Sequence, residues 1–172
     1  MRRHAERADR RDEQSGLSDA GRALCLRIAA TAPAYALVVA SPRPRAIETA
    51  RLIGQRLDSV EPVLLPGLHG LPHEFWVGLD DLADYANLSR SQDGARRLGE
   101  EQASLWAALG SKLHNADRAL AVSHGAVIEL GAMAIAQRLE VALEGPVFGY
   151  CEGVVVTFRD RAPTRIELLR VT

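Results

Sequence analysis

Helix-like and strand-like hydrophobic patterns alternate along the whole chain. Residues 17–33 have a helical pattern, with Ser18 in position to cap the helix and Pro33 just past its end. The short apolar runs at 35–41 and 118–123 are typical of buried strands, and each leads directly into a helical pattern. We expect Ser41 to cap the helix that follows the run at 35–41, and the first turn of that helix tolerates Pro44.

The remaining segments continue this alternation. We expect a strand at residues 61–66, a shaped loop at 67–78, helices at 79–88 and 95–113 with a break at 93–94, and an apolar helix from His124 onward. The end of the chain is β-rich, with a turn near Pro163. This order predicts one α/β domain over residues 1–172, with three α/β/α layers around a mostly parallel sheet.

Composition and charge indicate an ordinary globular protein. The 172 residues are 47% hydrophobic and 25% charged, and the net charge of −1 gives no indication of a nucleic-acid or membrane partner. Lys112 is the only lysine, so the other cations are arginines, whose guanidinium groups suit phosphate. Because Cys25 and Cys151 are far apart and no secretory or membrane-spanning segment is evident, we expect a reduced, cytoplasmic protein.

Several common catalytic motifs are missing from the sequence. The surroundings of Lys112 do not form a phosphate-binding P-loop, no glycine-rich dinucleotide motif follows a strand, and neither cysteine has an arginine six residues later. His69 and His73 are four residues apart, but Pro72 between them prevents a helical zinc-binding face. We therefore expect no metal site.

Histidines and arginines occur where predicted strands end. Arg43 and Arg45 follow the strand at 35–41, and His124 follows the strand at 118–123. Arg3 and His4 join them if the residues before His4 belong to a strand. The carboxyl ends of parallel strands meet at one edge of a sheet, so these side chains are expected to converge on one pocket. Guanidinium groups bind phosphoryl oxygens, and a neutral imidazole is a nucleophile for phosphorus.

Four sequence blocks together resemble one known family. They are "RHAE", "LSDAGRAL", "SPRPRAIETA" and "VSHGAVIE", in this order between residue 3 and about residue 129. The chain thereby resembles the histidine phosphatase superfamily, also called phosphoglycerate mutase-like. The alanine after His4 is closest to its compact phosphohistidine-phosphatase-like branch. The resemblance implies a phosphoglycerate mutase-like fold.

The resemblance also implies roles for particular residues. His4 would become phosphorylated, Arg3 and Arg45 would clamp the phosphate, and His124 would stabilise the transferring group. Arg45 is preferred to Arg43 because it directly precedes the "Ala-x-x-Thr-Ala" block. The family needs no metal or nucleotide cofactor. Taken singly, each of these residues has a structural explanation, such as a solvated terminus for Arg3 and His4.

Two features depart from the family pattern. The family's usual general acid, a glutamate, falls where this chain has Gly67 or Leu68, which leaves Glu74, with His69 and His73 as rivals, or no acid at all. In addition, only three residues precede His4, whereas strands usually have about five. We expect a further segment upstream of residue 1, because the lost hydrogen bonds of a central strand are hard to replace.

These observations predict a metal-independent phosphatase that hydrolyses a phosphate monoester or phosphohistidine through phosphohistidine at His4, with Glu74 as the acid. The substrate would be a phosphorylated small molecule or protein, with no nucleic-acid or membrane partner. Residues 66–116 would roof the pocket, and Phe75, Trp76 and Tyr85 could line it, whereas the helical spacing of Trp106 favours the core. The alternative is a non-catalytic or degenerate module that binds a phosphorylated ligand. Oligomeric state stays open.

Overall fold

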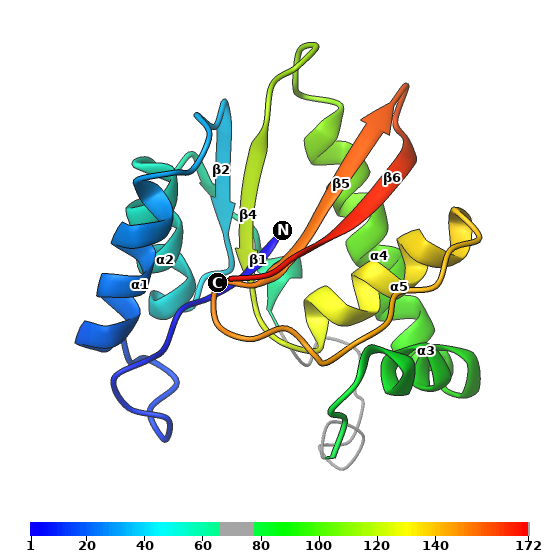
Figure 1. Cartoon of the computed structure of the whole chain (residues 1–172), viewed down its shortest axis with the longest axis horizontal. Coiled ribbons are helices and arrows are strands. Elements are labelled where there is room, and N and C mark those ends of the chain that lie inside the picture. Colours follow the sequence, from blue (N-terminus) through cyan, green and yellow to red (C-terminus); the bar gives the residue numbers. More distant parts are fainter. Residues whose placement is uncertain (66–77, 172) are drawn as a thin grey trace.

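A six-stranded sheet forms the centre of the computed structural model, which describes residues 1–65 and 78–171 (Figure 1). The strand order is β3-β2-β4-β1-β5-β6. The first four strands of this order run parallel, whereas β5 pairs antiparallel with β1 and with β6. The strands are β1 (Arg2–Arg3), β2 (Leu37–Ala40), β3 (Ser59–Val60), β4 (Ala119–Ser123), β5 (Gly153–Arg159) and β6 (Ala162–Leu169).

Helices cover both faces of this sheet (Figure 1). They are α1 (Asp19–Ala29), α2 (Pro44–Gly54), α3 (Leu82–Ser91), α4 (Asp93–Gly110) and α5 (Val127–Arg138), with a short 3-10 helix η1 (Pro62–Leu64). Val38 packs in the core with α1 and α2, and its neighbour Val39 packs on the opposite face with Leu109 of α4. Successive strand residues point to opposite faces, so this pair marks the two halves of the core. The predicted three-layer α/β fold is confirmed.

Local sequence signals account for some element ends. Ser18 caps α1 as predicted, because its hydroxyl accepts from Gly21 N. The strand expected at 61–66 is wrong, since β3 lies at Ser59–Val60 and Pro62, which has no N–H for a ladder, begins η1.

Two further boundaries differ from prediction. The break between the two middle helices lies at Gln92 rather than at 93–94. The final turn is formed by Asp160 and Arg161, both with positive φ, and Pro163 pairs within the edge strand β6.

The helix α5 is buried on all sides and makes a rigid support for the residues before it. Ten consecutive residues, from Val127 to Ala136, are buried, and all of them except Glu129 are apolar or glycine. It packs against α4, and Trp106 of α4 is 3% exposed within the same core, as its spacing predicted. None of the described helices combines the length and apolar composition that crossing a membrane requires.

The strand β1 is short but lies in the middle of the sheet, between β4 and β5. Arg2 pairs with Val122 on one side and with Gly153 on the other. The chain continues this pairing past the strand, since His4 N donates to Ser123 O and Cys151 N donates to Arg3 O. The backbone of His4 is therefore held by the sheet. The upstream segment expected from the sequence stays a prediction.

Candidate active site

Three neighbouring parallel strands end at one pocket. His4 follows β1, His124 follows β4, and the segment from Ser41 to Arg45 follows β2. The pocket has a volume of about 430 Å³, and Arg3, His4, Arg45 and His124 all line it. The structure thus brings together four of the five site residues that the sequence predicted.

His4 is held in one tautomer, with an unprotonated ring nitrogen on the side of Arg45. Its Nδ1 lies 2.7 Å from the carbonyl oxygen of Ala5, which can only accept, so Nδ1 carries the proton. Nε2 consequently carries a lone pair, and Nε of Arg45 donates to it at 3.1 Å. His4 is 7% exposed and lines the pocket. This tautomer is the one that a nucleophilic imidazole needs.

A buried serine orients the second histidine. Ser41 Oγ lies 2.7 Å from Nε2 of His124, and Nη2 of Arg45 lies 3.4 Å from Nδ1. With Nδ1 accepting from Arg45, Nε2 donates its proton to Ser41. The prediction that Ser41 caps α2 is therefore wrong, because the N-cap residue is Arg43 and its side chain makes no capping bond. The two imidazole rings meet edge to face, with centroids 5.1 Å apart.

Arg3 lies across a glycine and is only partly satisfied. Its Nη1 donates to Phe148 O at 2.6 Å, and its guanidinium carbon lies 5.3 Å from the ring centroid of Tyr150. A Cβ on Gly125 would come within 3.3 Å of that carbon, so the close passage of Arg3 favours glycine there. Nε of Arg3 is buried without a hydrogen-bond partner among the described residues. This leaves a donor for a pocket ligand.

The turn from His124 into α5 carries backbone strain. Ala126 has φ +66° and ψ −48°, a conformation that residues with a Cβ rarely adopt. Strain of this kind costs on the order of 1–3 kcal/mol and is often found at functional sites. Ala126 also lines the pocket, so the strained residue borders the space that a ligand would occupy.

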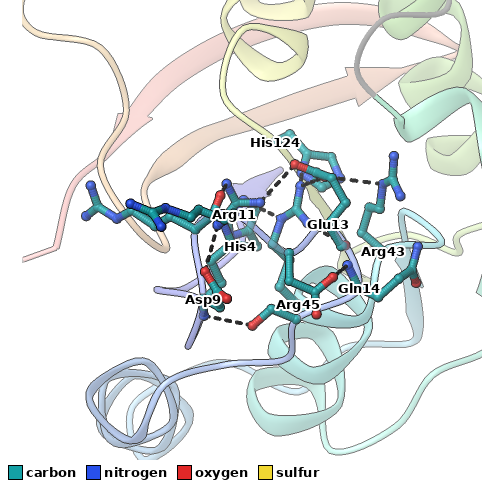
Figure 2. Close-up of polar contacts among 12 residues, drawn as sticks. His4, Asp9, Arg11, Glu13, Gln14, Arg43, Arg45 and His124 are labelled. Carbon is teal, nitrogen blue, oxygen red and sulfur yellow. Dashed lines mark hydrogen bonds and ion pairs between the residues drawn. The ribbon is translucent and has the colours of Figure 1, made fainter.

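The carboxylate of Glu13, in the first loop, forms ion pairs with arginines at the pocket. Glu13 Oε2 lies 2.9 Å from Nη2 of Arg45 and 3.6 Å from Nε of Arg43, and its Oε1 accepts from Arg7 at 2.9 Å. Figure 2 shows Glu13 between Arg43 and Arg45, close to His124. The arginines thereby converge on one anionic group, as they would on a phosphate.

Burial and positive charge keep both histidines neutral. The pKa of His4 is lowered to about 4, mainly by burial and then by Arg45, Arg3 and Arg7, against the bond to Ala5. The pKa of His124 is lowered to about 2, mainly by burial and then by His4 and Arg45. The arginines, with the bond from Arg7 as the largest cause, lower the pKa of Glu13 to about 2. The pocket therefore combines neutral imidazoles with a fully ionised carboxylate.

Some predicted residues lie outside the described part of the chain. These are Glu74, together with His69, His73, Phe75 and Trp76. Of the predicted roof at 66–116, Leu79 and Tyr85 line the pocket, and α4 packs mainly on α5. Among the described residues, no group of three or more His, Cys, Asp or Glu side chains is arranged to hold a metal ion.

Sequence reasoning missed several residues of the pocket. Arg7, Arg10, Glu13, Glu129 and Tyr150 all line it. Thr49 was also missed: its hydroxyl accepts from Ala5 N and donates to Arg45 O, which ties the segment of His4 to α2. The "Thr-Ala" ending of the third sequence block could have indicated Thr49. The loop residues carry no comparable signal.

A model of the histidine phosphatase superfamily (branch 1) matches residues 1–170. The chain belongs to this superfamily. Its similarity to solved structures extends over nearly the whole chain. The phosphoserine phosphatase of Entamoeba histolytica, solved in complex with 3-phosphoglyceric acid, is 17% identical with a TM-score of 0.71, and the match covers 99% of this chain and 95% of that one.

Other histidine phosphatase-like structures agree in fold. The mycobacterial glucosyl-3-phosphoglycerate phosphatase is 20% identical, with a TM-score of 0.59 over 98% of this chain and 94% of that one. The Bacillus stearothermophilus protein YhfR is 18% identical, with a TM-score of 0.62 over 95% and 92% of the two chains. At these identities the likeness establishes the phosphoglycerate mutase-like fold. No curated protein matches the sequence.

Proposed function

We propose that this chain is a metal-independent phosphatase that hydrolyses a phosphate monoester or phosphohistidine through a phosphohistidine formed on His4. The observation that carries the proposal is the His4 tautomer, with Nδ1 bonded to Ala5 O and an unprotonated Nε2 beside Arg45. A lowered pKa keeps this nitrogen unprotonated at neutral pH. Membership of the histidine phosphatase superfamily supports the same chemistry.

The residues around His4 would divide the work of the transfer. The phosphoryl group replaces Glu13 on Arg45, and the free Nε–H of Arg3 supplies a further donor. Nε of Arg45 gives up its hydrogen bond to Nε2 of His4 and turns to the phosphoryl oxygens, and the freed Nε2 lone pair attacks phosphorus as the ester oxygen leaves. A bound phosphate dianion raises the pKa of His124, so Nδ1 of His124 gains a proton and donates to the crowded oxygens. Water then attacks the phosphohistidine and releases inorganic phosphate.

The substrate belongs to one of two chemical classes. Solved relatives include enzymes named for phosphoserine and for glucosyl-3-phosphoglycerate, which favours a small phosphorylated molecule. The "RHAE" block favours the compact phosphohistidine-phosphatase-like branch, whose substrate would be a protein phosphohistidine. Assays on p-nitrophenyl phosphate, phosphoserine and a phosphohistidine-bearing protein separate these classes.

Trapping the intermediate tests the proposal directly. We expect incubation with radiolabelled p-nitrophenyl phosphate, followed by an alkaline quench, to yield an acid-labile label on the protein. His4→Ala should abolish both the label and turnover. The matched control is His114→Ala, a substitution of an exposed histidine in the loop after α4, which should retain both.

The alternative is a module that binds a phosphorylated ligand without turnover. The ion pair between Glu13 and Arg45 favours this alternative. An internal anion at that position would lower the occupancy of any phosphate. If the protein shows neither label nor turnover, and His4→Ala binds inorganic phosphate as well as the parent does, the phosphatase proposal is wrong and the binding module stands.

A further inference from the structure

Two carboxylates line the pocket, and their surroundings are opposite. Glu13 lies among arginines and has a half-exposed side chain, 52% accessible. Glu129, in the first turn of α5, is 1% exposed and makes no ion pair within 4.0 Å in the described part of the chain. Pairs of carboxyl groups in such contrasting environments commonly divide into one permanent anion and one proton donor.

The geometry of Glu129 leaves one oxygen for a ligand. Oε1 accepts from Phe148 N at 3.0 Å, which fixes the side chain. Oε2 is buried and has no hydrogen-bond partner among the described residues. A buried polar atom without a partner is destabilising, so a bound molecule that pairs with Oε2 would remove that cost.

Glu129 lines the same pocket as the two histidines and Arg45. His4, Arg45 and His124 form the phosphoryl end, as their contacts with one another show. Beyond that end, the lining includes Leu79, Tyr85, Ala126 and Val147 together with the charged residues Arg7, Arg10 and Glu13. With the phosphoryl group held by His4, Arg45 and His124, the alcohol part of an ester extends along this remaining lining, which includes Glu129.

Burial of Glu129 favours a protonated carboxyl. Burial raises its pKa, and this effect outweighs the nearby N–H groups of Glu129, Phe148 and Ala126 and the charge of Arg3 on β1, all of which lower it. From α3, Tyr85 is the other titratable group that faces it, and burial and the charge of Glu129 raise the pKa of Tyr85. Glu13 cannot serve in this way, because its arginines hold the carboxylate ionised.

We infer that Glu129 donates the proton to the leaving oxygen in the reaction proposed above, on which this inference rests. The His4 Nε2 lone pair forms the N–P bond, the P–O ester bond breaks, and its electron pair takes the proton of Glu129, which releases an alcohol and leaves a carboxylate. In the second step a water molecule gives its proton to that carboxylate as its oxygen attacks phosphorus. The N–P electron pair returns to His4 and Glu129 regains its proton.

The test compares esters that differ in their need for an acid. An alkyl phosphate expels a strongly basic oxygen, whereas p-nitrophenolate leaves unaided. We expect Glu129→Gln to lower kcat/KM for an alkyl phosphate by about 10²–10⁴-fold, to lower it far less for p-nitrophenyl phosphate, and to remove the alkaline limb of the pH profile. Phosphohistidine should accumulate in this variant, since the base for water is also lost.

Controls separate catalysis from support of the fold. Glutamine keeps an oxygen that can accept from Phe148 N–H, whereas Glu129→Leu removes that acceptor. If Glu129 only supports the fold, Glu129→Gln should retain full activity on both esters, and Glu129→Leu should lose activity equally on both. That result would overturn the inference, as would a leaving-group-dependent loss in Glu74→Gln instead. Glu140→Gln, at the exposed residue after α5, should behave as the parent does. Absence of any phosphohistidine in the parent would instead refute the proposed function itself.

Discussion

Nε of Arg45 donates a hydrogen bond to Nε2 of His4 at 3.1 Å, so a buried guanidinium is bonded to the atom proposed as the nucleophile. The same guanidinium reaches Glu13 through Nη2 at 2.9 Å. A cation that orients a neutral imidazole also favours its unprotonated form. Arg45 thus contacts both the unprotonated nitrogen of His4 and the position of the pocket where an anion binds.

Arg45→Lys should lose most of these contacts while retaining the charge. A lysine ammonium cannot bond His4 and an anion through a planar fork, and hydrogen bonds to charged groups contribute about 1.5–3 kcal/mol. We expect kcat/KM for p-nitrophenyl phosphate to fall roughly 10- to 100-fold. Arg51→Lys, at an exposed position of the same helix, serves as the control. Equal activity in the two variants would contradict a role for the guanidinium fork.

Stability should fall as the pH is lowered through the histidine range. Folded His4 stays neutral down to about pH 4 and folded His124 down to about pH 2, whereas unfolded imidazoles take up protons near pH 6.5. The unfolded state therefore binds more protons, and the free energy of unfolding decreases by up to about 1.4 kcal/mol per pH unit for each histidine. Urea titrations between pH 6.5 and 5 measure this slope.

Substitution assigns this slope to the two buried histidines. His124→Gln should remove about half of the pH dependence, because it deletes one of the two suppressed titrations. His114→Gln, at the exposed surface, should leave the slope unchanged. A parent protein whose stability is flat over this range would show that the imidazoles are not held neutral.

Ser41→Ala should impair catalysis through His124. The hydroxyl lies 2.7 Å from Nε2 of His124, and a neutral hydrogen bond contributes about 0.5–1.5 kcal/mol, so kcat/KM should fall roughly 3- to 10-fold. The matched control is Ser123→Ala, which also removes a buried hydroxyl, one that donates to Leu64 O. Both variants should unfold more easily, but only Ser41→Ala should lose activity beyond its loss of stability.

Ser41 also illustrates what the sequence could and could not predict. The strand ends before Arg45 and His124 are readable from hydrophobic runs, so topology brings these two residues to one edge of the sheet. Arg3 and His4 follow no apolar run, and their place in the pocket was predicted from the family resemblance. Ser41 contacts His124 because the neighbouring strands β2 and β4 end side by side. From sequence alone, a serine before a helix equally suggests a cap. Glu13 belongs to a loop, whose path toward the pocket depends on long-range contacts with Arg43 and Arg45 that no local pattern encodes.

Glu13→Gln should strengthen the binding of free phosphate. The carboxylate occupies Arg45 and Arg7, so an incoming dianion must displace a like charge from the same donors. Because the Glu13 side chain is half exposed and its ion pairs are partly screened by solvent, we expect a modest effect, with the inhibition constant for inorganic phosphate falling about 3- to 10-fold. Competitive inhibition of p-nitrophenyl phosphate hydrolysis measures it.

A second variant of the same loop separates local contact from net charge. Asp12→Asn removes one negative charge next to Glu13, but the Asp12 carboxylate accepts from Gln14 N and the structure shows it in no ion pair with an arginine among the described residues. This variant should change the inhibition constant much less than Glu13→Gln does. If Glu13→Gln instead weakens phosphate binding, Glu13 holds the arginines in place for the ligand. The loss of that positioning would then outweigh the relief of charge repulsion between Glu13 and phosphate.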